Sequence, residues 1–348
     1  IANSRGNLQE AALQDDGRFH SHDDLEQLIQ KRGRADITKL TIDDEITNRP
    51  YQKTAIKSLV EWLNGKHRRG LLVLATGTGK TRVSISLCKL LDNNNWIKRV
   101  LFLADRTELV KQAHKNFEKF LPSQTMTSLS DETEPNKSAR FVFSTYQTMI
   151  NYINAEPVEF SIGHFDLIII DEAHRSVFGK YGAIFQYFDS LLIGLTATPR
   201  AEIDKNTFQL LELENEPNFE YTYDEAIADG YLCPYRLKKC NSKMINRGIR
   251  YNDLSPEQRE QLEKVWEYEK AMKGIPEDEE YHRDIQGNEI FNYLINDDTI
   301  DNVLSELMTN GQKVHSGEDV GKTIIFAYNH RHAERIVERF RHLYPERG

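Results

Sequence analysis

Short apolar runs alternate with longer, more polar stretches through the middle of the chain. Five of these runs would each fill one strand: Leu71–Leu74, Val100–Leu103, Phe141–Phe143, Leu167–Ile170 and Leu191–Leu195. Buried parallel strands read as continuous apolar runs because helices cover both faces of their sheet. Helical crossovers between the strands would supply the two covering layers. The pattern therefore predicts an α/β fold, with a doubly wound parallel sheet in a domain spanning residues 46–235.

The chain before and after this domain has a different pattern. Residues 1–45 are mainly polar, and we interpret them as a linker or the end of a missing N-terminal domain, with one short helix after Ser21. A second helix should begin at Pro50, because proline is favoured at the first helical position. Residues 236–290 are expected to form a connector with a charged helical insertion that begins at Ser255-Pro256-Glu257.

The last segment, residues 291–348, returns to alternation. We expect a helix around Thr299–Leu307, a strand at Thr323–Ala327 and a further helix from His330 to Leu343. This order predicts the start of a second doubly wound lobe, which is incomplete in this chain.

Composition limits the class of protein. The length of 348 residues suggests two domains, and 39% hydrophobic residues suffice for a core in each. No apolar run approaches the roughly 18 residues that cross a bilayer, and the first residues lack the pattern of a signal peptide. The three cysteines fit neither a zinc site nor a disulfide framework. We therefore expect a cytoplasmic protein without a membrane partner. The net charge of −9 does not exclude nucleic-acid binding, because only the surface that faces the strand needs positive charge.

A glycine-rich segment follows the first apolar run. The order strand, Gly-rich turn and helix start is typical of a Walker A phosphate loop, or P-loop, in which backbone N–H groups and the helix N-terminus surround an anion. Lys80 would reach the β- and γ-phosphates of ATP, and the Thr81 hydroxyl would hold Mg²⁺. The strict pattern has glycine where this chain has Leu74. The residues expected to contact the nucleotide here are Thr76, Gly77, Thr78, Gly79, Lys80 and Thr81.

Two adjacent carboxylates end the fourth apolar run. In a parallel sheet, Asp171 and Glu172 would face the same crevice as the phosphate loop. Asp171 would hold Mg²⁺, and Glu172 would activate or orient the attacking water. Two carboxylates this close repel each other without a cation, so the pair favours a metal. With Lys80, they form the predicted catalytic group.

The order of the motifs resembles that of superfamily 2 helicases and translocases. The DEAH box Asp171-Glu172-Ala173-His174 is followed, after the next predicted strand, by Thr196-Ala197-Thr198-Pro199. The segments Leu103–Leu109, Asp171–Ser176 and Ile324–Ala327 are similar to the motor (R) subunit of type I restriction enzymes. The resemblance implies two RecA-like lobes that close on MgATP.

The resemblance also implies roles for particular residues. Arg49 and Gln52 match the segment that contacts adenine, and His174 would bridge the γ-phosphate region and the segments that contact the strand. Thr196 and Thr198 match the coupling segment, whose hydroxyls link the nucleotide state to domain closure.

Two further residues match segments that grip the nucleic-acid backbone, Arg106 and Thr145. Contacts to phosphate position a strand without reading its sequence. For the whole protein, the resemblance implies an ATP-driven translocase on double-stranded DNA that works with modification and specificity subunits. It also implies a nuclease domain, for which residues 1–45 contain no convincing set of residues.

Two other classes remain open at this point. A DNA-repair or RNA helicase of the same superfamily would share the ATP motifs but separate strands. A non-motor ATP-binding switch would bind nucleotide without turnover that nucleic acid stimulates. The presence of Lys80, Asp171 and Glu172 together argues against the switch.

Overall fold

A computed structural model of the chain describes most of its residues. The described residues are 22–37, 41–173, 177–203, 205–237, 297–314, 319–327 and 329–347, with the single positions 256, 259, 260, 263, 266 and 317. The chain divides into two compact units, Ile1–Tyr235 and Arg236–Gly348, and each is described by itself.

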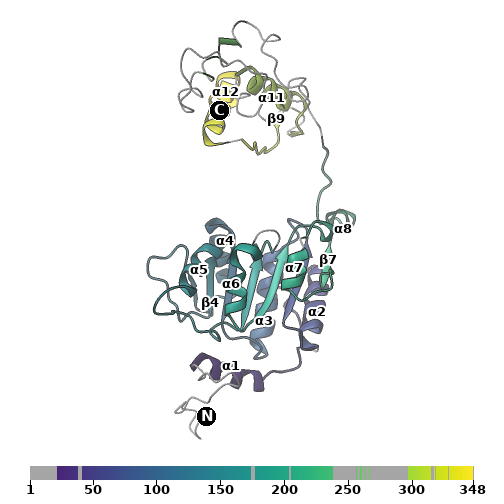
Figure 1. The fold of residues 1–348 in the computed structure, drawn as a ribbon. Coiled ribbons are helices and arrows are strands. Elements are labelled where there is room, and N and C mark those ends of the chain that lie inside the picture. Colours follow the sequence, from purple (N-terminus) through teal and green to yellow (C-terminus); the bar gives the residue numbers. More distant parts are fainter. Residues whose placement is uncertain are drawn as a thin grey trace. The chain divides into compact units, whose positions relative to one another are not determined.

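A seven-stranded parallel sheet forms the centre of the first unit (Figure 1). Its strand order is β3-β4-β2-β5-β6-β1-β7, and every pair of neighbouring strands in it is parallel. The strands are β1 (Arg69–Leu74), β2 (Val100–Ala104), β3 (Met126–Ser128), β4 (Phe141–Thr145), β5 (Leu167–Asp171), β6 (Leu191–Thr196) and β7 (Phe219–Tyr221). All five predicted strands form. The two edge strands, β3 and β7, were not predicted, since each is only three residues long and has no long apolar run.

Helices cover both faces of this sheet. Residues of α2 (Pro50–Asn64), α3 (Lys80–Asn93), α4 (Thr107–Phe120) and the short α8 (Tyr223–Ala228) pack with Leu72 and Leu74 in one core. Residues of α5 (Tyr146–Ile153), α6 (Val177–Tyr187) and α7 (Lys205–Leu210) pack with Leu71 and Val73 in the other. Successive residues of β1 thus enter opposite cores, as they must when a strand is buried on both faces. The predicted doubly wound α/β fold is confirmed for this lobe.

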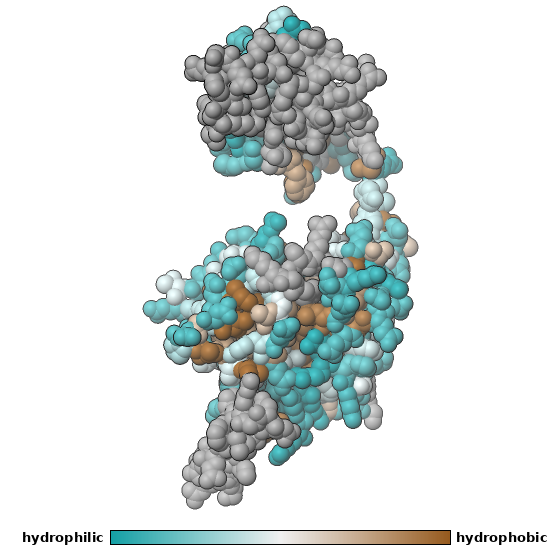
Figure 2. All heavy atoms as spheres, in the orientation of Figure 1, coloured by the Kyte–Doolittle hydropathy of each residue, from teal (hydrophilic) through white to brown (hydrophobic). Residues whose placement is uncertain are grey.

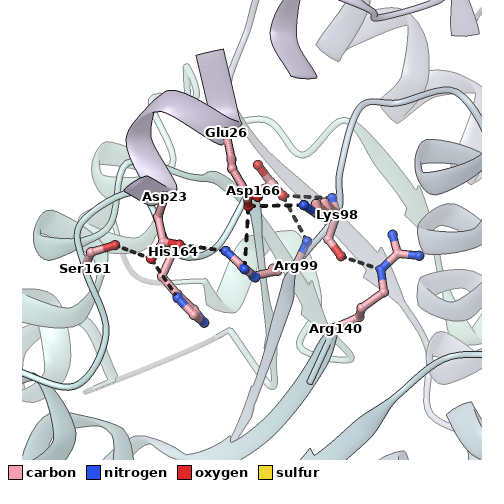
Figure 3. A network of polar contacts seen from close by, with 8 residues as sticks. All are labelled: Asp23, Glu26, Lys98, Arg99, Arg140, Ser161, His164 and Asp166. Atoms are coloured by element: carbon pink, nitrogen blue, oxygen red, sulfur yellow. Dashed lines mark hydrogen bonds and ion pairs between the residues drawn. The ribbon is translucent and has the colours of Figure 1, made fainter. Parts of the chain in front are cut away.

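The helix α1 (His22–Arg32) lies at the edge where the strands begin (Figure 3). Its Asp23 accepts hydrogen bonds from the Arg99 guanidinium at 2.8 Å and from the Ser161 hydroxyl at 2.6 Å. Glu26, one turn further along α1, accepts a hydrogen bond from Lys98 Nζ at 3.1 Å. These pairs attach α1 to the residues that directly precede β2, so residues 22–32 belong to the first unit.

The same edge is reinforced below α1 by a buried carboxylate. One oxygen of Asp166 accepts the backbone N–H groups of Lys98 and Arg99, at 2.8 and 2.9 Å. The Arg140 side chain, which precedes β4, donates to the Lys98 carbonyl at 3.0 Å. The residues before β2, β4 and β5 are therefore joined to one another (Figure 3).

The surface of the first unit is mainly hydrophilic on the face shown in Figure 2, where apolar residues form separate patches. Among the described residues, no helix is both long enough and apolar enough to cross a membrane.

The second unit contains two longer helices, α11 (Asp297–Asn310) and α12 (His330–Leu343), and the short antiparallel strands β8 (Lys313–Val314) and β9 (Asp319–Val320). Ion pairs such as Arg335–Asp297, at 2.7 Å, join the two helices. Both predicted helices form, and α12 has the predicted bounds. Short 3₁₀ turns at Arg200–Glu202 in the first unit and at Pro345–Arg347 in the second complete the described elements.

The predicted strand Thr323–Ala327 is wrong for this structure, because residues 323–327 form no strand. Ile324 and Phe326 are 80% and 92% exposed. A strand needs a neighbour to pair its backbone, and among the described residues of this unit none pairs with this segment. Most of the expected helical insertion after Ser255 lies outside the described residues. The assignment of 1–45 as a linker and of 236–290 as a connector stays a prediction.

Candidate active site

The predicted site residues meet at the edge where the strands of the first unit end. In the strand order β5-β6-β1, the acidic pair follows β5, the coupling segment follows β6 and the glycine-rich loop follows β1. The register brings these ends level, since Asp171 pairs with Leu195 and Val73 pairs with Thr196. The three segments follow strands that end at Leu74, Asp171 and Thr196, and the sheet topology makes them adjacent.

The glycine-rich loop has a backbone that needs glycine at two positions. Gly77 and Gly79 have φ values of 85° and 90°, in the left-handed region that disfavours other residues. A Cβ atom at Gly79 would also lie 2.7 Å from Nε2 of Gln52. Gly79 is the N-cap of α3 and has no side-chain cap, so the helix begins at Lys80 with its first N–H groups free of a capping side chain. Such a helix start attracts an anion.

The three threonines in and beside the loop differ in exposure. Thr78 is fully buried, and its hydroxyl donates to the Ala75 carbonyl at 2.6 Å, so this side chain stabilises the turn. Thr76 is exposed, and Thr81, in the first turn of α3, is half-buried. The structure therefore separates a structural threonine from two that solvent can reach.

The start of α2 packs against this loop. The Tyr51 hydroxyl and Gln52 Nε2 both donate to the Thr78 carbonyl, at 2.6 and 2.9 Å. Arg49, the N-cap of α2, donates to the Tyr51 hydroxyl at 2.9 Å, and its guanidinium lies 5.0 Å from the centre of the Tyr231 ring. Thus both residues predicted to contact adenine lie beside the loop.

The side-chain oxygen of Gln52 has no hydrogen-bond donor among the described residues. The Gln52 side chain is 2% exposed, and this Oε1 is buried. An unpaired buried acceptor is costly, and a donor from a ligand would satisfy it.

Aromatic residues that no sequence motif predicted lie beside Gln52. Tyr51 stacks on Tyr221, with ring centres 3.9 Å apart, and meets Tyr231 edge to face at 5.2 Å. These rings come from α2, β7 and the segment after α8, and only the long-range pairing of β7 with β1 brings them together.

The acidic pair lies opposite the loop lysine. Lys80 Nζ is 3.4 Å from Oε1 of Glu172, and the two side chains are 13% and 34% exposed. Burial and the neighbouring charge of Glu172 raise the pKa of Asp171 to about 6, although Lys80 acts in the opposite direction. Glu172 has a φ of 54°, which is unusual for a residue with a side chain. A cation beside Asp171 would favour its ionised form, so this carboxylate suits a metal.

The hydroxyl of Tyr146 donates to the backbone carbonyl of Asp171 at 3.0 Å. The sequence analysis did not select Tyr146, because nothing in the spacing of residues links it to the acidic pair. Burial and the nearby carboxylates raise its pKa well above that of an ordinary tyrosine, so the hydroxyl keeps its proton.

The predicted coupling residues lie at the end of β6. Thr196 is fully buried, and its Oγ1 accepts the backbone N–H of Thr198 at 3.0 Å, which forms the turn after the strand. His174 lies outside the described residues.

The two predicted backbone-gripping residues follow neighbouring strands. Ala104, at the end of β2, pairs with Thr145 at the end of β4. Arg106 has an 80% exposed side chain, 3.6 Å from Asp105. Thr145 is instead 8% exposed, and its hydroxyl accepts the backbone N–H of Thr148 at 3.2 Å as the N-cap of α5. Arg106 is thus free to reach a ligand, while the Thr145 hydroxyl already has a structural partner.

A group of possible metal ligands also occurs at the opposite edge of the sheet. Ligand atoms of His22, Asp23 and Glu26 lie within 4.8 Å of one another. Asp23 and Glu26 already pair with Arg99 and Lys98, so cations of the protein neutralise these carboxylates. The group therefore supports no assignment as a metal site.

The parallel sheet, with a glycine-rich loop and an acidic pair at one edge, defines a RecA-like lobe. Comparison with known proteins agrees with this class. Residues 45–201 match the family described as the res subunit of type III restriction enzymes.

The chain is similar to subunits of type I restriction enzymes. It is 34% identical over 223 residues to the EcoAI endonuclease subunit of Escherichia coli, which covers 62% of this chain and 27% of that protein. It is 27% identical over 245 residues to the EcoKI endonuclease subunit of Escherichia coli strain K12, covering 61% and 20%. These matches confirm the predicted resemblance to superfamily 2 helicases and to the R subunit of type I restriction enzymes. The chain spans only about a quarter of the length of these relatives.

A solved structure is also similar. The Hef helicase domain of Pyrococcus furiosus has a TM-score of 0.44 and 22% identity to this chain, covering 78% of this chain and 57% of that one.

Proposed function

We propose that this chain is part of an ATP-dependent motor that moves along double-stranded DNA, within the R subunit of a type I restriction enzyme. The observation that carries the proposal is the meeting of Lys80, Glu172 and the glycine-rich loop at one edge of a RecA-like sheet. The relationship to two type I endonuclease subunits supports DNA as the polymer and modification and specificity subunits as partners.

The residues of the site fit MgATP. The exposed start of α3, the two left-handed glycines and Lys80 suit the β- and γ-phosphates. The unpaired Oε1 of Gln52 suits the amino group of adenine, and Arg49 lies beside it. Thr81 and Asp171 are the residues that would hold Mg²⁺, which supplies charge neutralisation for the phosphates.

Glu172 is the residue proposed to take a proton from the attacking water. It lies 3.4 Å from Lys80, so a water placed between the acidic pair and the phosphates would be within its reach. Thr196 and Thr198 would pass the change at the phosphates to domain closure, together with His174. Arg106 would contact a backbone phosphate of the DNA, and Thr145 would do so through its backbone or with a rearranged hydroxyl.

The test is ATP hydrolysis by the complete protein with and without duplex DNA. Lys80→Ala should abolish DNA-stimulated turnover while it leaves folding intact, because Lys80 faces the site. Lys89→Ala is the matched control on the same helix, since Lys89 pairs with Asp43 and lies in the last part of α3. Near-normal hydrolysis by Lys80→Ala would disprove the site.

Movement along DNA is tested separately from hydrolysis. A translocase should displace a third strand bound to the duplex, in an ATP-dependent manner, without separating the duplex. Separated single strands as the product would favour the helicase alternative. Nucleotide binding without any DNA-stimulated hydrolysis would favour the switch.

A further inference from the structure

Tyr146 connects the end of β4, where DNA contact is proposed, with the end of β5, where the acidic pair lies. It is the first residue of α5 and directly follows Thr145, at the end of β4. Its side chain is 1% exposed, and its hydroxyl donates to the Asp171 carbonyl at the end of β5. In the sheet, β2 lies between β4 and β5, so this hydrogen bond crosses the end of one strand.

The carbonyl that accepts this hydrogen bond belongs to the peptide group between Asp171 and Glu172. The orientation of this peptide sets the directions in which the two carboxylates leave the chain. Glu172 has its φ of 54° directly after this peptide, a conformation that the surrounding structure must hold in place. A hydrogen bond from a buried hydroxyl provides such support, because leaving it unmade would be costly.

The other end of the link is the N-terminus of α5. The backbone N–H of Thr145 donates to the Ser130 hydroxyl at 2.8 Å, and the Thr145 hydroxyl caps the helix. A contact that moves the backbone at Thr145 therefore also moves Tyr146, which is covalently next to it. The Tyr146 ring also stacks on Tyr181 of α6, with ring centres 5.4 Å apart.

We propose that the Tyr146 hydroxyl is a positioning group that carries the effect of DNA contact at Thr145 to the Asp171–Glu172 peptide. This proposal rests on the proposed DNA-dependent hydrolysis of ATP. DNA bound at the end of β4 fixes the start of α5, the Tyr146 hydroxyl then fixes the peptide, and Glu172 is held in its working orientation towards Lys80.

The variant that tests this is Tyr146→Phe in the complete protein, which removes only the hydroxyl from a buried ring. The matched control is Tyr187→Phe, because the Tyr187 hydroxyl donates to the Phe160 carbonyl at 2.7 Å in the same unit without contacting the site. We expect the ratio of DNA-stimulated to basal turnover to fall about fivefold in Tyr146→Phe, the size of one net hydrogen bond, and to stay unchanged in Tyr187→Phe. The KM for ATP and the melting temperature should match those of the control.

Two results would overturn the role of Tyr146. One is an unchanged stimulation ratio. The other is an equal loss of basal and stimulated turnover with a melting temperature well below that of the control, which would indicate a merely structural hydroxyl. The magnesium dependence of nucleotide binding can be measured without ATP hydrolysis. Tyr146→Phe should need several-fold more Mg²⁺ than Tyr187→Phe to reach half-maximal nucleotide binding. If the unmodified protein binds nucleotide but never hydrolyses it, the proposed function fails, and this binding measurement still decides for or against Tyr146.

Discussion

The two edges of the same parallel sheet both carry clusters of charged side chains, but the charges are paired differently. Where the strands begin, Asp23 accepts hydrogen bonds from Arg99 and Ser161, and its pKa falls to about 2. Where the strands end, burial and the charge of Glu172 raise the pKa of Asp171 to about 6. At the first edge each carboxylate lies beside a cation of the protein, whereas at the second edge the carboxyl of Asp171 lies beside another carboxylate, Glu172, which shares the single nearby cation of Lys80.

The difference supports the proposal that the active site lies at the edge where the strands end. A carboxylate with two or three good partners is stabilised as it stands and has little to offer a ligand. Three features are costly for the folded protein: a carboxylate beside another carboxylate, an unpaired buried amide oxygen and a strained backbone. A bound ligand can offset part of this cost. Asp171, Glu172 and Gln52 carry all three at the edge where the strands end.

The largest expected effect is on turnover at the second edge. Glu172→Gln keeps the size of the side chain and removes the base, so hydrolysis should fall by roughly a hundredfold or more. Nucleotide binding, measured by the fluorescence of a labelled ATP, should persist. Asp171→Asn should instead change the magnesium dependence. Identical magnesium responses in the two variants would contradict this division of roles.

Replacing one arginine at each edge should have different effects: the change at the first edge should lower stability, and the change at the second should weaken DNA binding. Arg99→Met removes the cation that pairs with Asp23 and leaves Glu26 with Lys98 alone, so we expect a loss of about 2 kcal/mol in the free energy of unfolding. Arg106→Met is the matched control at the other edge, because the Arg106 side chain is 80% exposed. It should leave stability unchanged within about 0.5 kcal/mol and weaken DNA binding.

Urea unfolding and the salt dependence of DNA binding measure these two properties. Equal stability losses in both arginine variants would show that the edges do not differ as we argue.

The two edges also differ in how much of their structure could be predicted from the sequence. The five inner strands and the glycine-rich turn before α3 could be predicted because each is a local pattern, an apolar run or a run of glycines. The ion pair of Arg99 with Asp23 joins residues 76 positions apart, and no local pattern marks either residue. The stacking of Tyr51 on Tyr221 likewise depends on the pairing of the short strand β7, which has no continuous apolar run.

At Thr323–Ala327 a strand was predicted that does not form, whereas β7 formed without having been predicted. The apolar residues of the predicted strand give a clear local pattern, but a strand also needs a neighbour with which to pair. Local pattern predicts which residues can form an element, and the surrounding chain decides whether they do.

The smallest expected effects concern the pH dependence of stability, and they should have opposite signs at the two edges. Burial alone would raise the pKa of Asp23, but hydrogen bonds from Ser161 and His164 and the charge of Arg99 outweigh it and lower the pKa to about 2. The unfolded state then binds more protons as the pH falls from about 4 to about 2, so the stability that Asp23 contributes is present above about pH 4 and is lost below it. For Asp171, with its pKa near 6, the folded state binds more protons between about pH 4 and 6, so stability falls as the pH rises through that window.

Asparagine variants should therefore act in opposite directions at neutral pH. At about pH 8, without divalent cations, Asp171→Asn should stabilise the protein by about 1 kcal/mol and Asp23→Asn should destabilise it by about the same amount, after allowance for solvent screening. The gain from Asp171→Asn should disappear by about pH 4, while the loss from Asp23→Asn should persist at pH 4 and diminish only as the pH approaches 2. Urea unfolding midpoints across this range, at one salt concentration, measure both changes. Added Mg²⁺ and nucleotide should then reverse the advantage of Asp171→Asn, because only the ionised carboxylate binds the cation well. Two variants that shift stability in the same direction at pH 8 would mean that the carboxylates at both edges are equally well paired, and the contrast between a stabilising edge and a chemical edge would be lost.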